Sequence, residues 1–262
     1  MFGKLLKYDF RSMFKQFAFV WPAALALALV NHFTIDGIDS SSSVGETTAG
    51  IAMMIYVAIL MAMFIIALIF TIQRFFKGLL GDEGYLMHTL PVKPWQLITS
   101  KLLCAVVTTM LSVIVAIVSI FLIFPWDAEA FRQVFQGLDY LFSHWNGEMT
   151  RAVFCLLEVL LFMLVSLATG YLQLYLSMSI GHLFNKNRVA MSVIAFIVIN
   201  ALAGTLLSFL PSWDTFDPFA SGLRGMDLFQ RAIWTAIGTE LVHSAVYFIG
   251  TEFILRKKLN LE

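Results

Sequence analysis

Charged side chains are scarce in this chain, and their two signs balance. Asp, Glu, Lys and Arg make up 13% of the 262 residues, whereas hydrophobic residues make up 60%. A typical soluble domain is about one quarter charged, so this composition excludes disorder and disfavours a soluble fold. The 17 basic residues equal the 17 acidic ones, so no basic excess indicates a nucleic-acid partner.

Motifs for cofactor chemistry are missing as well. The sequence has no Gly-x-x-x-x-Gly-Lys-Ser/Thr phosphate loop, no His-Glu-x-x-His zinc motif, no Gly-x-Ser-x-Gly elbow and no Cys-x-x-Cys pair. Its two cysteines, Cys104 and Cys155, lie in apolar runs, where a thiol usually packs as a small hydrophobe. We therefore expect no metal or cofactor in this chain, and ATP, if it is used, must bind to another chain.

Long apolar runs dominate what is present. A helix needs roughly 20 mostly apolar residues to cross a bilayer, and lipid leaves unpaired backbone groups unsatisfied. The sequence predicts an all-α, polytopic membrane protein with six transmembrane helices, which we treat as a single domain over residues 1–262. The predicted spans are residues 17–33, 50–72, 102–124, 152–180, 189–210 and 233–255.

The distribution of basic residues predicts the orientation, because cytoplasmic segments retain Lys and Arg. Most of the 17 basic residues fall before the first span, in the second and fourth connections and in the tail. The opposite side holds Arg132, Arg151, Arg224 and Arg231. Both termini are therefore predicted to be cytoplasmic.

Three segments outside the spans have their own patterns. Residues 1–16 combine apolar residues at three- and four-residue spacing with basic residues, which favours an interfacial helix over a simple charged flank. Residues 125–150 and 211–232 are predicted outer connections rich in aromatics. The second of these is either a plain loop or a short element that re-enters the membrane between the fifth and sixth spans.

Polar residues inside spans are candidates for a substrate pathway or for buried structural hydrogen bonds. Glu240 and His243 share one helix face in the sixth span, and Asn200 lies in the fifth. Glu158 lies within the fourth span, where it either reaches outward to the interface or faces an interior cavity. The polar second half of that span is expected to line an interface or a cavity. There Ser166 and Gly170 form a small-xxx-small pair, and Gly170 allows close packing or a bend.

The connection between the second and third spans, residues 73–101, is too polar to cross the membrane and too apolar for a free loop. Tyr85 and Leu86 follow a series of glycines, and Pro91 and Pro94 end the segment. This pattern predicts a short amphipathic helix in the cytoplasm, whose exposed apolar residues suggest a partner surface. The alternative is a helix that lies on lipid.

This segment resembles the cytoplasmic connection of type-2 ATP-binding cassette (ABC) exporter permeases, including the subgroup linked to bacterial peptide-antibiotic efflux. The resemblance covers about 28 residues: an acidic-Gly-Tyr-Leu run, then Thr-Leu-Pro-Val, then Ser-Lys at the start of the next span. The other residues match by topology alone.

The resemblance implies a non-catalytic permease in the bacterial plasma membrane. It would pair with a second permease copy or paralogue and with two ATP-binding cassette subunits, which carry ATP and Mg. Asp82, Glu83, Tyr85 and Leu86 would then belong to a coupling helix that docks on the ATPase. An apolar or amphipathic substrate, such as a peptide antibiotic, drug or lipid, is implied without being identified.

Two other classes stay open from the residues alone. A membrane-embedded enzyme would need a nucleophile or metal constellation, and Glu158, Glu240, His182 and His243 match no such motif. A regulatory or assembly protein without transport activity is the other alternative.

Overall fold

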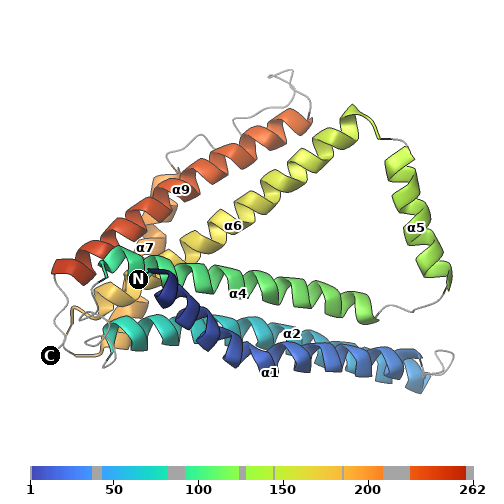
Figure 1. Cartoon of the computed structure of the whole chain (residues 1–262), viewed down its shortest axis with the longest axis horizontal. Coiled ribbons are helices and arrows are strands. Elements are labelled where there is room, and N and C mark those ends of the chain that lie inside the picture. The colour runs from blue at the N-terminus through green and yellow to red at the C-terminus, as the bar shows by residue number, and fades with distance from the viewer. Residues whose placement is uncertain are drawn as a thin grey trace. The chain divides into compact units, whose positions relative to one another are not determined.

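The described part of the chain is helical. The computed structural model describes residues 2–36, 43–81, 92–123, 128–143, 145–184, 186–208 and 225–257, and these contain no strand, which confirms the all-α prediction. The elements are α1 (Phe2–Asp36), α2 (Ser43–Phe75), the π-helix η1 (Phe76–Leu80), α4 (Pro94–Ile123), α5 (Ala128–Ser143), α6 (Gly147–Gly181), α7 (Arg188–Ser208) and α9 (Gly225–Lys257) (Figure 1).

Among the described residues, six helices are long and apolar enough to cross a membrane, which confirms the six predicted spans. They are Phe2–Thr34, Gly50–Leu80, Pro94–Ile123, Met149–Gly181, Arg188–Thr205 and Leu228–Lys257. The chain is therefore a multi-pass membrane protein. Lipid offers no water to bond with backbone groups, and a helix satisfies those groups internally. Each long apolar run is therefore helical.

The first helix differs from the sequence expectation. Residues 1–16 were expected to form a helix separate from the first span, but α1 continues without a break through this boundary. Pro22 lies inside α1, where a missing N–H and a ring clash favour a bend, and Figure 1 shows α1 changing direction along its length. The amphipathic pattern itself is present, since Lys7 and Arg11 are exposed whereas Met13 is buried.

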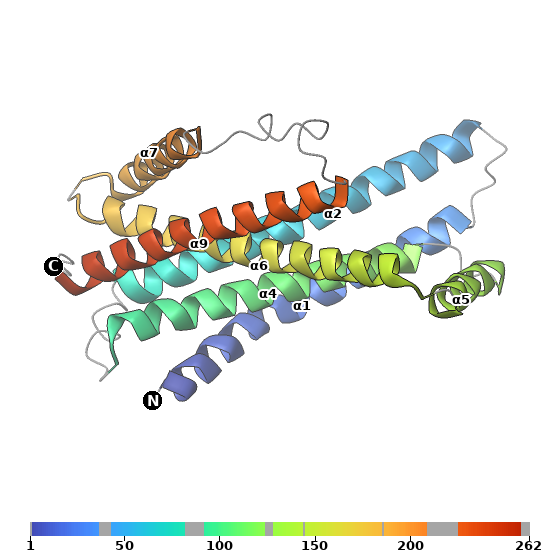
Figure 2. The ribbon, with the colours of Figure 1, turned by 90° about the horizontal axis from the view of Figure 1, so that it is seen from above.

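The outer connections also contain more helix than expected. The 125–150 connection holds α5, a separate short helix in Figure 2. Phe135 and Phe142 are seven residues apart on one helix face, a spacing that fits an amphipathic helix as well as a series of boundary aromatics. In the 211–232 connection, residues from Gly225 onward belong to α9, and the re-entrant element falls on residues outside the described part.

The chain divides into two compact units. Helices α2 and α4 each belong to one unit over part of their length and to the other unit over the remainder. The α1 unit contains Gly3–Thr71 and Val107–Asn146, and the α6 unit contains Ile72–Val106 and Gly147–Glu262, together with Met1–Phe2. The single domain predicted from the sequence stays a prediction.

Hydrogen bonds between helices align the α1 unit. Trp21 Nε1 donates to Ser112 Oγ at 3.0 Å, and the hydroxyls of Tyr56 and Ser119 lie 2.7 Å apart. The buried side chains of Ala24, Met63 and Ala116 pack together between these bonds. Such small and hydroxyl-bearing residues let membrane helices approach closely and bond to one another.

The α6 unit is built on a parallel pair of helices. The order of contacts along α6 and α9 is the same: Glu158 with Trp234, then Thr169 with Glu240, then Leu176 beside Gly250. In Figures 1 and 2 the two helices run side by side. Helix α7 returns after the short turn that follows Gly181, so it runs antiparallel to α6 and packs against it.

Candidate functional site

The C-terminal end of α2 is fixed to α6 by a pair of stacked aromatic rings. The rings of Phe75 and Tyr175 lie 3.9 Å apart between centroids and 6° from parallel. Both side chains are almost completely buried, at 0% and 1% exposure. Burial of two large aromatic surfaces is strongly stabilising, so this contact holds the residues that follow Phe75 in a defined place.

The next five residues form the π-helix η1 rather than another α-helical turn. Gly81 N–H donates to the Phe76 carbonyl at 2.7 Å, which closes the wide turn. A side chain added at Gly78 would meet Lys101 Nζ at 3.2 Å, so glycine lets the buried Lys101 side chain from α4 approach the backbone. Short π-helical turns are frequent at functional sites, and this one leads directly into residue 82.

The turn between α6 and α7 packs against η1 through His182. The His182 ring lies 5.9 Å from the Phe76 ring, and its Nε2 is 3.4 Å from Arg188 Nη1. Burial and the positive charge of Arg188 lower the pKa of His182 below its usual value of 6.5, against the opposing effect of backbone groups that include Leu80. We therefore expect a neutral imidazole at neutral pH.

Close packing completes this turn. A Cβ at Gly181 would clash with Ser192 and would lie 2.7 Å from the Arg188 carbonyl. Asn187 adopts a positive φ of 56°, a conformation that asparagine tolerates better than most residues. At Gly170, where the sequence suggested close packing or a bend, a Cβ would meet no atom of another helix within 4 Å among the described residues. The tight contact is at Gly181.

The four predicted coupling residues, Asp82, Glu83, Tyr85 and Leu86, lie outside the described residues. What the structure describes is the support on either side of them. Helix α2 continues into η1, which ends at Leu80, and α4 begins at Pro94. The candidate site is therefore the set of contacts made by Phe75, η1 and His182, from which residues 82–91 extend.

The predicted polar residues of the spans fall in separate places. Glu158 Oε1 accepts a hydrogen bond from Trp234 Nε1 at 3.1 Å, and its other oxygen, Oε2, is buried with no hydrogen-bond partner in the described structure. Glu240 is half-buried, and its backbone carbonyl accepts a bond from Thr169 Oγ1 at 3.2 Å. These two contacts join α6 to α9.

His243 and Asn200 are not brought together with the two glutamates. The His243 ring stacks on Tyr247, one turn later in the same helix, at 5.9 Å. Asn200 is exposed on α7, and its side-chain amide donates to the Phe196 carbonyl at 2.9 Å. The described residues contain no group of three or more His, Cys, Asp or Glu that could hold a metal ion.

The stacking of Phe75 on Tyr175 could not be predicted from the sequence. Phe75 lies at the start of the 73–101 connection and Tyr175 lies in the fourth predicted span, and nothing in either local pattern distinguishes them from other aromatic residues of a membrane protein.

Three comparisons with known proteins, by family model, curated sequence and solved structure, returned no match.

Proposed function

We propose that the chain is the membrane-spanning permease subunit of an ABC exporter in the bacterial plasma membrane. The observation that carries this proposal is the position of the 73–101 segment. Its sequence resembles the coupling connection of type-2 exporter permeases. The segment starts at the C-terminal end of α2, which packs against α6 through the stacked rings of Phe75 and Tyr175. A docking element needs such an attachment if movement of a partner is to reach the spans.

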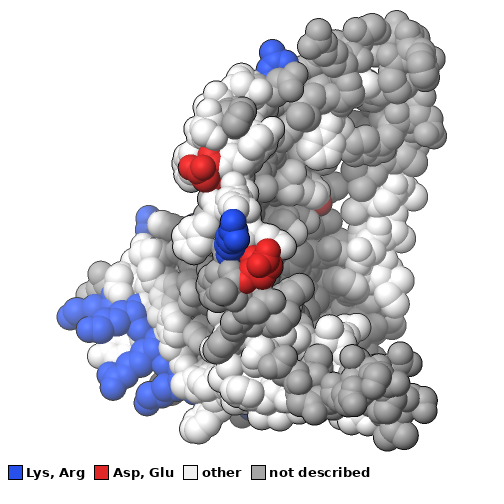
Figure 3. Space-filling model, turned by 90° about the vertical axis from the view of Figure 1, so that its right-hand side faces the viewer, with Lys and Arg blue, Asp and Glu red and all other residues white. Residues whose placement is uncertain are grey.

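The charge distribution supports the orientation in this proposal. Basic residues concentrate in the segments assigned to the cytoplasm, and on the face in Figure 3 most visible Lys and Arg side chains form one group that excludes the visible acids. With both termini inside, residues 73–101 and the α6–α7 turn lie on the cytoplasmic side. An ATPase would then meet the chain at residues 82–91.

The proposed subunit has no catalytic residue of its own. Two partner ATP-binding cassette subunits would bind ATP and Mg, and a second permease copy or a paralogue would complete the membrane part. Closure of the ATPases would move residues 82–86, and η1 with His182 would pass this movement to α6 and α7. Glu240 and His243 remain candidates for the pathway of an apolar or amphipathic substrate.

A charge-reversal experiment tests the proposal. In the variant Glu83→Arg/Leu86→Glu, we expect the partner ATPase to be lost from detergent-purified complexes, or to hydrolyse ATP without export, while the permease itself still folds. The matched control is Glu129→Arg/Phe135→Glu, which makes the same exchanges on exposed residues of α5. An ATPase that co-purifies with the wild type and the control, but not with the variant, supports the coupling role.

Two outcomes would contradict the proposal. Wild-type chain purified gently from its native membranes without any ATP-binding subunit or ATPase activity would remove the exporter assignment. Unchanged co-purification and unchanged export in the variant would instead leave an exporter whose coupling element lies elsewhere in the chain.

A further inference from the structure

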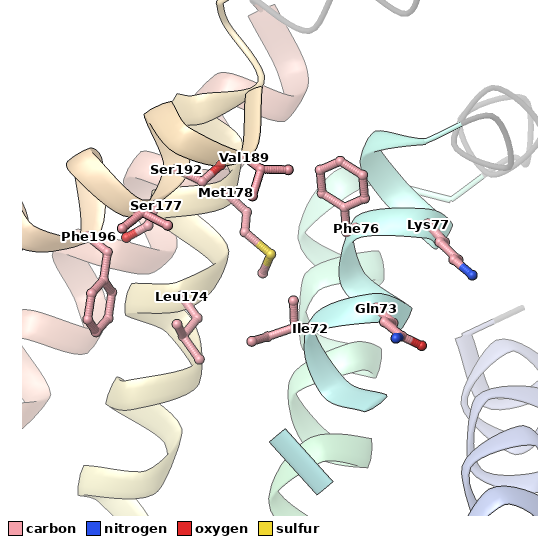
Figure 4. A pocket seen from close by; sticks show the side chains of 11 residues that line it. Ile72, Gln73, Phe76, Lys77, Leu174, Ser177, Met178, Val189, Ser192 and Phe196 are labelled. Atoms are coloured by element: carbon pink, nitrogen blue, oxygen red, sulfur yellow. The ribbon is translucent and has the colours of Figure 1, made fainter. Parts of the chain in front are cut away.

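A pocket of about 430 Å³ lies within the α6 unit, beside η1. It is formed where the end of α2, the last turns of α6 and the first turns of α7 meet. Figure 4 shows Ile72 and Phe76 on one side and Leu174, Met178 and Val189 facing them. The volume falls in the range of small-molecule sites, which is about 300–1,000 Å³.

The wall of this pocket is almost entirely apolar, although two serines contribute to it. Ser177 Oγ donates to the Gln173 carbonyl at 2.7 Å, and Ser192 Oγ donates to the Arg188 carbonyl at 2.9 Å. Both hydroxyl protons are therefore committed to their own helices. A polar ligand would lose hydration here without gaining donors, whereas a hydrocarbon chain would lose nothing.

Part of the pocket wall lies at the surface of α7. Val189 and Val193 line it and are 69% and 53% exposed, so α7 leaves part of it uncovered. The lining residues also lie at the ends of three membrane spans, Gly50–Leu80, Met149–Gly181 and Arg188–Thr205. This places the pocket at the depth of the upper acyl chain of one leaflet, next to the headgroups.

The rim of the pocket is basic. Lys77 lines it and is exposed, and Figure 4 shows its side chain directed away from the apolar residues. Arg188 directly precedes the lining residue Val189 in the chain, and Lys186 lies three residues before it. The segments 72–81 and 174–196 contain no Asp or Glu, so no acid in these segments neutralises the rim. An apolar pocket with a cationic rim is complementary to an amphiphile with an anionic headgroup.

We propose that this pocket binds one acyl chain of an anionic phospholipid from the adjacent leaflet, with the headgroup phosphate at Lys77 and the Lys186–Arg188 turn. The chain packs against Phe76, which belongs to η1, so the bound lipid contacts the element that supports residues 82–91. The site depends on the geometry of the α6 unit alone and would be present whether or not the protein is an exporter.

Photochemical labelling in nanodiscs tests this site. The probe is phosphatidylglycerol with a diazirine in the middle of one acyl chain, compared with phosphatidylcholine that carries the same chain. We expect the phosphatidylglycerol probe to label Leu174, Met178 and Phe196 in preference to Val198, which is exposed on α7 outside the pocket. Phosphatidylcholine carries the same phosphate, but its choline cancels the charge. The preference for the net negative phosphatidylglycerol should be about fivefold for one neighbouring lysine.

Two matched pairs of variants separate the chain site from the headgroup site. Val193→Trp fills the pocket and should abolish labelling of Leu174 and Met178, whereas Ile194→Trp, at the next and equally exposed residue, should not. Lys77→Gln should remove most of the preference for phosphatidylglycerol, whereas Lys93→Gln, an exposed lysine that does not line the pocket, should leave it unchanged. Val189→Phe is a smaller filling variant if Val193→Trp does not fold.

Three results would overturn the proposal. Equal labelling of the pocket residues and Val198 would indicate annular lipid only. Equal labelling by the two probes, with no effect of Lys77→Gln, would show that the chain binds without recognition of an anionic headgroup. Labelling of Leu174 and Met178 that survives both filling variants would place the bound chain elsewhere.

Discussion

The two halves of α6 have similar lengths but very different surroundings. In the first half, large apolar residues are mostly exposed: Val153, Phe154, Leu156, Leu157, Leu160, Leu161, Met163 and Leu164. In the second half most residues are buried, namely Thr169, Tyr171, Leu172, Tyr175, Leu176, Ser177, Met178 and Ser179. The first half is thus left to lipid or a partner, whereas the second half is enclosed by protein.

Three contacts enclose the second half. Phe75 at the end of α2 stacks on Tyr175, Gly250 of α9 lies against Leu176, and Ser192 of α7 approaches Gly181. Each comes from a different helix. The densely packed part of α6 is therefore the end next to η1.

The largest expected effect of this difference is on stability. Tyr175→Ala should lower the free energy of unfolding by about 3–5 kcal/mol, because it removes a large buried side chain and its stacking partner. Leu160→Ala, at a residue that is 48% exposed, should change it by less than about 0.5 kcal/mol. Reversible unfolding in mixed micelles measures both. Similar losses for the two variants would mean that the halves of α6 do not differ in packing.

A pair of glycine substitutions tests the same contrast along one helix. Gly181→Ala should destabilise the protein by about 1–3 kcal/mol, because the new methyl group clashes with the backbone of α7. Gly170→Ala meets open space and should stabilise it by up to about 1 kcal/mol through helix propensity. Thermal unfolding of the purified variants gives the two signs. A neutral Gly181→Ala would indicate that α7 moves away from α6 freely.

Much of the fold could be predicted from the sequence, because the length of an apolar run sets whether a helix can span a membrane. The six spans follow from this rule. The polar second half of the fourth span was expected to line an interface or a cavity, and many of its residues are buried in the structure. Helix α5 was missed because its aromatic residues also fit the pattern of a membrane boundary. The continuity of α1 was missed because a change of charge is not a helix stop signal.

The candidate site was harder to predict. The pairs Phe75–Tyr175 and Glu158–Trp234 join residues far apart in the sequence, and hydropathy contains no information about which faces of two helices meet. A π-helical turn has no simple sequence signature, so η1 was unexpected. The coupling residues could be named only because a short motif in residues 73–101 resembles a known family.

A smaller effect is expected for the polar contact in the exposed half of α6. Glu158→Leu and Trp234→Phe each remove one partner of the 3.1 Å hydrogen bond between α6 and α9. A double-mutant cycle should give a coupling energy of about 0.6–1.7 kcal/mol, the range for hydrogen bonds between membrane helices. Glu158→Gln keeps an acceptor oxygen and should retain most of this energy. A coupling energy near zero would make the bond irrelevant to the pairing of α6 with α9.

The smallest expected effect is the pH dependence that His182 gives to the enclosed end of α6. Its pKa is lowered in the folded protein by burial and by Arg188, so the unfolded chain binds the proton more readily. The stabilising contribution is therefore complete above the usual pKa of 6.5 and decreases as the pH falls from there toward the lower pKa of the folded state. His182→Gln should flatten the stability curve between about pH 7.5 and about pH 5.5. Arg188→Gln removes one cause of the lowered pKa of His182, so the decrease should be smaller than in the wild type. Chemical unfolding at closely spaced pH values measures the slope, and an identical slope in wild type and His182→Gln would show that His182 is protonated equally in the folded and unfolded states.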